Sequence, residues 1–167
     1  MFDVNVLIDA VVWRDDNLFE AWPSPPPVSR NPAADCVGII NDAVEFGLWL
    51  SPHILDNVDR VLSTAETDGG YEWAATRVEE YLEVLVDMAE ASGGGVVDPD
   101  FVITDCPDYE DNRILEAAWA SQSVLIVAND KDLVEMSPNP WRGTPIIRPR
   151  EFVGRVDAMR RSRRHRR

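Results

Sequence analysis

Apolar residues follow two alternating patterns along this chain. In some segments they recur every three or four positions, which predicts amphipathic helices. Elsewhere they form short continuous runs, which are typical of buried strands. The expected helices cover Asn5–Trp13, Asn31–Glu45, Ser51–Leu62, Tyr71–Ala91, Tyr109–Ala120 and Pro149–Met159. The expected strand segments are Phe2–Asp3, Leu48–Leu50, Val96–Ile103, Val124–Ala128 and Pro145–Ile147. The alternation predicts an α/β fold whose mainly parallel sheet is covered by helices on both faces.

Capping residues, prolines and glycines mark where the expected elements begin and end. Asn31-Pro32 and Ser51-Pro52 each combine a helix-capping side chain with a proline at the first helical position. The segment Ala21–Arg30 contains four prolines and is expected to be a loop, because proline cannot continue a regular element. The glycine run Gly93–Gly95 is expected to end the longest helix.

Length and composition limit the class of protein. The 167 residues suit one domain, and no apolar run approaches the roughly 18 residues of a membrane span. The first residues lack the basic region of a signal peptide, and two cysteines are too few for a disulfide scaffold, so we expect a cytoplasmic protein. Two cysteines and two histidines, all scattered, make a zinc site improbable.

The net charge of −14 is unevenly distributed. Residues 142–167 carry ten arginines and two acidic residues, a net charge of +8, which leaves −22 on residues 1–141. We therefore divide the chain into a domain over residues 1–157 and a basic, disordered tail over residues 158–167. Its arginines are expected to contact nucleic-acid phosphates, to form a disordered solubilising end, or to fold back on the acidic body. The arginines considered for nucleic-acid contact are Arg160, Arg161, Arg163 and Arg164.

Short acidic side chains follow the expected strands. Asp3 comes after the first strand, Asp130 and Asp132 come after Val124–Ala128, and Asp111 stands at a helix start. Ligands of parallel sheets gather beyond the carboxyl ends of the strands. Clustered carboxylates repel one another unless a cation neutralises them, and hard oxygen ligands favour Mg²⁺ or Mn²⁺. The simpler interpretation, a helix cap, applies best to Asp105 and Asp108, while Asp132 is either a further ligand or a loop cap.

Five motifs in order resemble the PIN-domain nucleases over residues 1 to about 155. The motifs are Asp3-Val4-Asn5, then Ser51-Pro52 with Val61-Leu62 ten residues on, Asp111-Asn112-Arg113-Ile114-Leu115 with Ala117-Ala118, Asn129-Asp130-Lys131-Asp132-Leu133, and Pro149-Arg150-Glu151-Phe152. The ending is similar to that of VapC-like toxins from toxin–antitoxin pairs. The resemblance implies a three-layer α/β/α sandwich and a Mg²⁺- or Mn²⁺-dependent endoribonuclease.

The same resemblance implies a set of site residues and partners. Asp3, Asp111 and Asp130 would hold the metal, which lowers the pKa of a water and stabilises charge on the phosphate. Asn5 would either orient Asp3 or cap the following helix. The expected partners are an RNA substrate, a small antitoxin protein and, as a family expectation, a second copy of the chain.

Two features depart from the family pattern. Only Met1 and Phe2 precede Asp3, so either the first strand is nearly absent or the true start codon lies upstream. The acidic residue of the middle helix is usually Glu, and the register places Asn57 there. On a helical wheel, Asn57 and Asp59 both flank the apolar face and Asp56 lies opposite it. Either Asn57 or Asp59 is therefore expected to border the site.

Two other functions remain open at this stage. The first is a PIN fold with weakened or lost catalysis that binds RNA or protein through its surface, for which Asn57 is the motive. The second is a phosphohydrolase with an Asp nucleophile after the first strand. It ranks lower because such enzymes usually carry Asp-x-Asp there and this chain has Asp3-Val4-Asn5.

Overall fold

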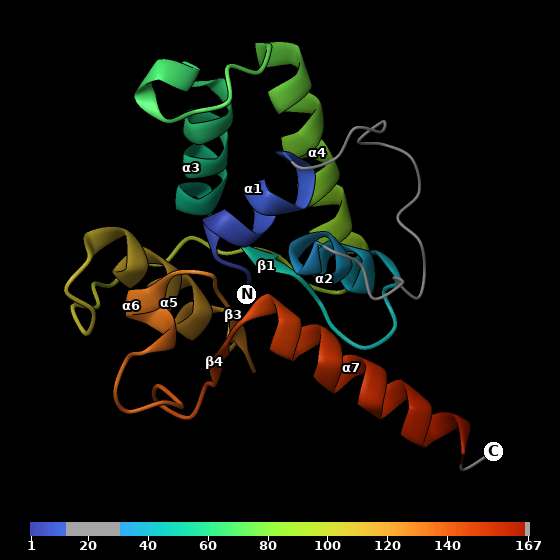
Figure 1. Cartoon of the computed structure of the whole chain (residues 1–167). Coiled ribbons are helices and arrows are strands. Elements are labelled where there is room, and N and C mark those ends of the chain that lie inside the picture. The colour runs from blue at the N-terminus through green and yellow to red at the C-terminus, as the bar shows by residue number, and fades with distance from the viewer. Residues whose placement is uncertain (13–30, 166–167) are drawn as a thin grey trace.

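The computed structural model describes residues 1–12 and 31–165, so the expected loop over Ala21–Arg30 lies outside the described residues. Its helices are α1 (Val4–Val12), α2 (Pro32–Asn41), α3 (Pro52–Ser63), α4 (Ala75–Ala91), α5 (Tyr109–Ala120), α6 (Lys131–Val134) and α7 (Pro149–Arg164), with a short 3-10 helix, η1, over Glu66–Asp68. The strands are β1 (Trp49–Leu50), β2 (Gly95–Val96), β3 (Ile126–Val127) and β4 (Ile146–Ile147). Helices surround these short strands (Figure 1).

Both expected helix starts are confirmed. The side chain of Asn31 accepts hydrogen bonds from the backbone N–H groups of Ala33 and Ala34, each at 3.1 Å. Ser51 Oγ accepts the N–H of Ile54 at 3.3 Å. These bonds satisfy amide groups that have no partner inside the first turn of a helix.

Two helix boundaries differ from the sequence-based prediction. Helix α2 ends at Asn41 rather than Glu45, because Ala43 has a φ of +50° and so cannot continue a right-handed helix. Helix α4 begins at Ala75 rather than Tyr71. The preceding backbone is bound instead to the end of α3, where Trp73 N–H donates to the carbonyl oxygen of Leu62 at 2.8 Å. Tertiary contacts override the local helical pattern at this end.

The strands pair in parallel. β1 pairs with β2, β3 pairs with β4, and Phe2 forms a parallel bridge to Val127. The backbone around Gly94 approaches β1 so closely that a Cβ atom there would lie 1.8 Å from the carbonyl oxygen of Leu48. The glycine run therefore ends α4 and also permits the pairing of β1 with β2.

The predicted α/β class and parallel pairing hold, but the predicted single sheet is found only in part. The described residues form two separate two-stranded sheets, and Phe2 extends one of them by a single bridge. Each paired strand is two residues long. The described part of the chain therefore does not form one continuous central sheet of a clear three-layer sandwich.

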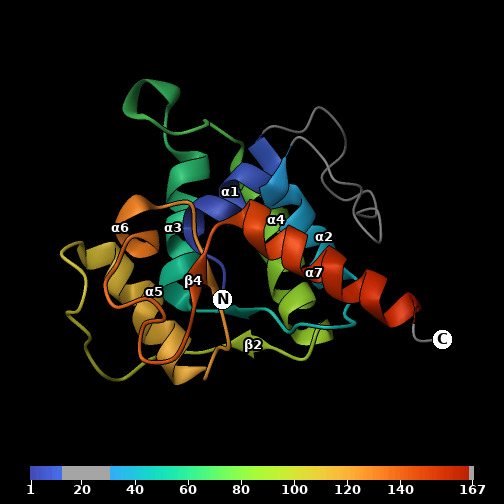
Figure 2. The same ribbon diagram turned by 60° about the horizontal axis from the view of Figure 1, so that its bottom comes forward.

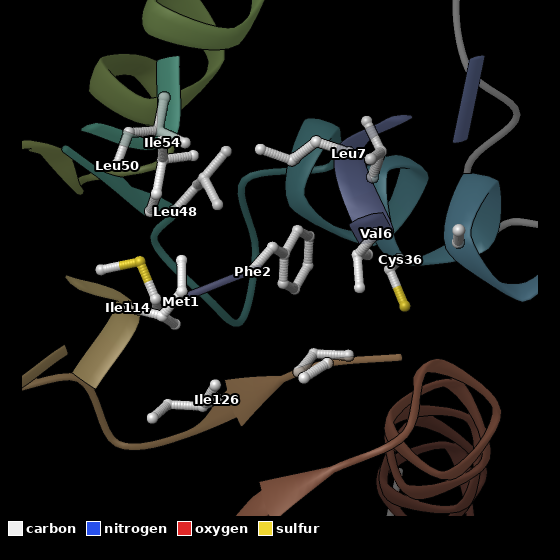
Figure 3. Packing of buried hydrophobic residues seen from close by; sticks show 14 of the residues in the cluster. Met1, Phe2, Val6, Leu7, Cys36, Leu48, Leu50, Ile54, Ile114 and Ile126 are labelled. Carbon is white, nitrogen blue, oxygen red and sulfur yellow. The ribbon is translucent and has the colours of Figure 1, made fainter. Parts of the chain in front are cut away.

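The core lies between these strands and the helices around them. Figure 3 shows Met1 and Phe2 at its centre, with Leu48 on one side and Ile126 on the other. Phe2 is 2% exposed, and the N–H of Val127 donates to the carbonyl oxygen of Met1 at 3.0 Å. The first residues thus bridge to β3 within the core and bring Asp3 to the interior.

Helix α7 corrects the prediction for the basic tail. It was expected to end near Met159, but it continues to Arg164, so residues 158–164 are helical rather than disordered. Figures 1 and 2 show α7 leaving β4, passing α2 and projecting from the body at its end. Among the described helices, none combines the length and the apolar character that crossing a bilayer requires.

Candidate active site

Asp3 lies where the N-terminal segment leaves β3 and enters α1. Its N–H donates to Val127 O at 2.9 Å, and its carbonyl oxygen accepts the N–H of Val6 at 3.0 Å. The side chain is 5% exposed, and its Oδ2 atom is buried without a hydrogen-bond partner among the described residues. A buried carboxylate oxygen without a donor is costly, so this atom marks a place that requires a cation or a proton.

Asp130 lies just beyond the end of the neighbouring strand. After β3, the N–H of Ala128 still donates to Ile147 O at 3.0 Å, which keeps the chain beside β4. Asp130 Oδ1 then accepts the N–H of Asp132 at 2.7 Å and caps the short helix α6. Because Phe2 and β3 run parallel, Asp3 and Asp130 emerge at the same edge.

Asp111 is placed by a tightly bonded helix start. Asp108 caps α5 by accepting the N–H groups of Glu110 and Asp111 at 2.7 and 3.4 Å, as the sequence predicts. The thiol of Cys106 donates to Asp111 Oδ2 at 3.3 Å. Desolvation raises the pKa of Cys106 to about 11, so the thiol stays protonated as a donor. The Asn112 side chain fixes the Cys106 backbone with bonds of 2.9 and 2.7 Å.

The three carboxylates meet in one pocket of about 190 Å³. Its other lining residues are Val4, Asn5, His53, Asn57, Arg60, Val61, Asp108, Glu110 and Ile114. Carboxylate oxygens of Asp111, Asp130 and the exposed Asp132 lie within 4.8 Å of one another. Asp3 stands outside that tight group but opens into the same pocket. Elements far apart in the sequence thus converge on one acidic cavity.

Burial and mutual repulsion disfavour ionisation of this cluster. Burial, followed by the charge of Asp111, raises the pKa of Asp3 to about 7. Burial also raises the pKa of Asp111 to about 6, and the charges of Asp130, Asp108 and Asp132 act in the same direction. A divalent cation would reverse this effect, because it favours the charged form of every carboxylate around it.

The donor set fits a hard divalent cation. It consists of carboxylate oxygens from Asp3, Asp111 and Asp130, with Asp132 beside them, and the buried Oδ2 of Asp3 lacks any other partner among the described residues. Oxygen ligands of this kind suit Mg²⁺ or Mn²⁺ better than Zn²⁺, which prefers sulfur and nitrogen. The cluster is therefore able to hold a divalent metal.

One wall of the pocket is a polar network between α3 and α5. Asn57 Nδ2 donates to Glu110 Oε2 at 2.8 Å, and Asn57 Oδ1 accepts two bonds from Arg60, at 2.7 and 3.2 Å. His53 Nε2 lies 2.6 Å from the same Glu110 oxygen and 2.8 Å from Asn57 Nδ2. The wall thus combines a carboxylate, an amide, an imidazole and a guanidinium.

The structure resolves which residue of the middle helix borders the pocket. Asn57 is buried and lines the pocket, whereas Asp59 is exposed and does not. Asn5 is exposed at the pocket rim. Asp105 is not a helix cap; its carboxylate accepts bonds from Trp141 Nε1 at 2.9 Å and from the Arg142 guanidinium at 2.8 Å.

The arginines of α7 lie away from the pocket. Arg160 pairs with Asp42 at 2.9 Å and with Glu45 at 2.6 Å, at the end of α2. Arg163 reaches the same Glu45 at 3.5 Å. These two arginines therefore pack the helix against the acidic body, and none of the four arginines lines the pocket.

The other two arginines are more accessible. Arg161 pairs with Asp157, one turn earlier on α7, at 2.6 Å, and its side chain is 70% exposed. Arg164 is also exposed, and within the described residues its side chain forms no hydrogen bond or ion pair. Arg161 and Arg164 are thus more accessible to a binding partner than Arg160, whose side chain is 15% exposed.

Sequence reasoning missed three residues of the pocket wall: Glu110, His53 and Arg60. Helical spacing could have found two of them, because His53 and Arg60 lie four and three positions from Asn57 and so share its face of α3. No sequence pattern identified Glu110 as a pocket residue, because it lies in the first turn of α5 next to residues that were expected to cap the helix.

Comparison of the sequence with known protein families finds a match, and it includes the carboxylates of the pocket. A family model described as the PIN domain matches residues 1–132, a range that contains Asp3, Asp111 and Asp130. No curated protein and no solved structure matches the chain. PIN domains are typically nucleases and generally bind divalent metals. Because the match covers well over half of the sequence, the chain belongs to the PIN domain family.

Proposed function

We propose that this protein is a Mg²⁺- or Mn²⁺-dependent endoribonuclease. The observation that carries the proposal is the buried, unpartnered Oδ2 of Asp3 in a pocket that also receives Asp111 and Asp130. Three carboxylates that repel one another at the end of a parallel ladder are costly without a cation. The family match supports a nuclease, because PIN domains are typically nucleases.

Each residue has a distinct task in this proposal. Asp3, Asp111 and Asp130 hold the metal, and Asp132 adds negative charge beside them. Asp108 keeps the first turn of α5 in place, and Asn5 at the rim orients Asp3. When bound, Mg²⁺ or Mn²⁺ would lower the pKa of the attacking water and neutralise charge on the phosphate.

The wider biological role is also part of the proposal. The protein acts in the cytoplasm as the toxin of a toxin–antitoxin pair, and a small antitoxin blocks the acidic pocket. Arg161 and Arg164 contact phosphates of the RNA, and two copies of the chain associate. The motif order in the sequence, which resembles that of VapC-like toxins, motivates the toxin role, and the exposure of Arg161 and Arg164 motivates their contact with RNA.

Cleavage of a labelled RNA oligonucleotide tests the proposal. We expect the purified full chain to cut it in the presence of Mn²⁺, to stop with EDTA, and to lose cleavage on Asp3→Asn. Asp59→Asn removes one negative charge outside the pocket and should leave the rate unchanged. Metal-dependent cleavage that survives both Asp3→Asn and Asp111→Asn would overturn the assignment.

A second candidate function follows from Asn57, an amide where an acidic residue is expected. In that case the protein binds RNA or protein and cleaves nothing. RNA binding by the wild-type chain with no cleavage in Mg²⁺ or Mn²⁺ would favour this alternative over the nuclease.

A further inference from the structure

The wall between α3 and α5 contains a carboxylate that the motifs of the sequence do not include. Glu110 belongs to the first turn of α5 and lines the same pocket as Asp3, Asp111 and Asp130. Its Oε2 atom is tied to Asn57 and His53. Within the described residues, its Oε1 atom makes no hydrogen bond or ion pair and stays available to a ligand.

The side chain of Asn57 is hydrogen-bonded within this wall at both its oxygen and its nitrogen, so it does not coordinate a cation. Its oxygen accepts two bonds from Arg60, at 2.7 and 3.2 Å, and its nitrogen donates to Glu110 at 2.8 Å. Arg60 carries only donors, so it fixes the orientation of the amide. The nitrogen of Asn57 must then face Glu110, and its oxygen is already occupied.

The chemistry of the pair explains why an amide suits position 57. A carboxylate there would lie within hydrogen-bond distance of Glu110, and two like charges that close repel strongly. The neutral amide instead donates to the carboxylate and holds it without adding charge. The Asn57 side chain is mostly buried, so the bond to Glu110 is shielded from water on that side.

We propose that Glu110 is a fourth carboxylate of the cation site and that Asn57 is its positioning residue. The inference rests on the proposed function, because it assumes that the pocket takes a divalent metal. A second observation points to a ligand in this pocket: Asp3 Oδ2 is unpartnered among the described residues, on a side chain that is 5% exposed. Glu110 thus supplies from α5 the charge that α3 lacks.

Binding of Mn²⁺ to the full chain tests the role of Glu110 without reference to activity. Free Mn²⁺ is measured by electron paramagnetic resonance for the wild type, Glu110→Gln, Asp3→Asn and the control Asp59→Asn. We expect Glu110→Gln to weaken Mn²⁺ binding about 10- to 100-fold, and Asp59→Asn, which removes the same charge elsewhere, to leave it unchanged. Circular dichroism of each variant in EDTA verifies that it is folded.

A double-mutant cycle tests the role of Asn57. If Asn57 acts by holding Glu110, Asn57→Ala weakens Mn²⁺ binding in the wild type but adds little to Glu110→Gln. Full additivity of the two losses would show that Asn57 does not act through Glu110 and would overturn that part.

The outcomes separate this inference from the proposed function. If the wild type binds Mn²⁺ and Asp3→Asn abolishes binding, the metal site stands. Unchanged affinity in Glu110→Gln then overturns the role of Glu110 alone. If the wild type binds no Mn²⁺, the proposed function fails, and this inference fails with it.

Discussion

Two clusters of buried carboxylates in the described part of the chain differ in the cationic side chains that the protein places beside them. At the end of α2, the side chains of Asp42 and Glu45 are 3% and 5% exposed, and Arg160 pairs with both. In the pocket at the strand ends, Asp3 and Asp111 are similarly buried, yet no guanidinium or ammonium contacts them in the described part of the chain.

The difference between the two clusters separates a structural role from a functional one. In the α2–α7 cluster, defined as Asp42, Glu45, Arg160 and Arg163, two carboxylates pair with two guanidinium groups of α7, and these pairs anchor the helix. Within the described residues, each cluster contains one buried carboxylate oxygen without a hydrogen bond, Asp42 Oδ1 beside Arg160 and Asp3 Oδ2 in the pocket. The pocket differs because burial and neighbouring charges raise the pKa values of Asp3 and Asp111, and among the described residues no cationic side chain pairs with them. Stability alone does not explain such an arrangement, whereas a bound cation does.

The largest expected effect is the loss of catalysis when a pocket carboxylate is removed. Asp111→Asn keeps the shape of the side chain and removes its charge, so we expect RNA cleavage in Mn²⁺ to fall about 1,000-fold, the several kcal/mol that a metal contributes. Glu45→Gln makes the same chemical change in the α2–α7 cluster and should leave the cleavage rate of the folded protein unchanged. Equal losses in both variants would remove the distinction between the clusters.

The next effect concerns stability and falls on the other cluster. Arg160→Ala leaves the buried Asp42 carboxylate without a partner and Glu45 with only the longer contact to Arg163, which we expect to lower the free energy of unfolding by about 3 kcal/mol. Arg155→Ala breaks an exposed pair with Glu151 on the same helix and should cost less than about 1 kcal/mol. Urea unfolding of the two variants measures both values. A loss for Arg160→Ala as small as that of the control would contradict the anchoring role.

A third prediction concerns the pH dependence of stability without metal. The pKa values of Asp3 and Asp111, about 7 and about 6, lie above the ordinary 3.8, so the folded protein binds protons that the unfolded chain has released. The stability that these protons confer is present at low pH and is lost as pH rises from about 4 to 7. Asp3→Asn should flatten this fall and raise the Tm in EDTA at pH 8 by about 5 °C.

The measurement is a series of thermal unfolding curves in EDTA between pH 4 and pH 8. Asp59→Asn serves as the control, because its carboxylate is exposed and lies outside the pocket. If the Tm of the wild type and of Asp3→Asn changes in parallel with pH over this whole range, ionisation of Asp3 does not destabilise the folded protein, and the prediction is wrong.

The smallest expected effect comes from the accessible arginines of α7. In an Asp111→Asn background, where RNA stays intact, we expect Arg161→Ala/Arg164→Ala to reduce the salt slope of RNA affinity by about 1 to 2. Fluorescence anisotropy at several salt concentrations measures the slope. The control Arg155→Ala should leave it unchanged, and an unchanged slope in the double variant would remove these residues from the RNA contact.

The sequence predicted the parts of the site that depend on strand order. Asp3 and Asp130 follow apolar runs, and parallel pairing of those runs brings the two carboxylates to one edge. Asp111 was found through a motif at a helix start. The helix caps at Asn31 and Ser51 were equally local and equally predictable.

Contacts between distant elements could not be predicted in this way. Asn57 and Glu110 are 53 positions apart, and their bond depends on how α3 and α5 sit across the pocket. The pair of Arg160 with Glu45 spans 115 positions, and nothing in the composition of the arginine-rich end indicated that α2 would hold it. Local pattern fixes helices and strand ends, whereas these polar partners depend on tertiary packing.

The most direct test is the location of Mn²⁺ in crystals of the full chain, from its anomalous X-ray signal. The account predicts a peak among the carboxylates of Asp3, Asp111 and Asp130 and none at Asp42 and Glu45, where Arg160 already supplies the charge. No peak in the pocket, or a peak only at the α2–α7 cluster, would contradict it.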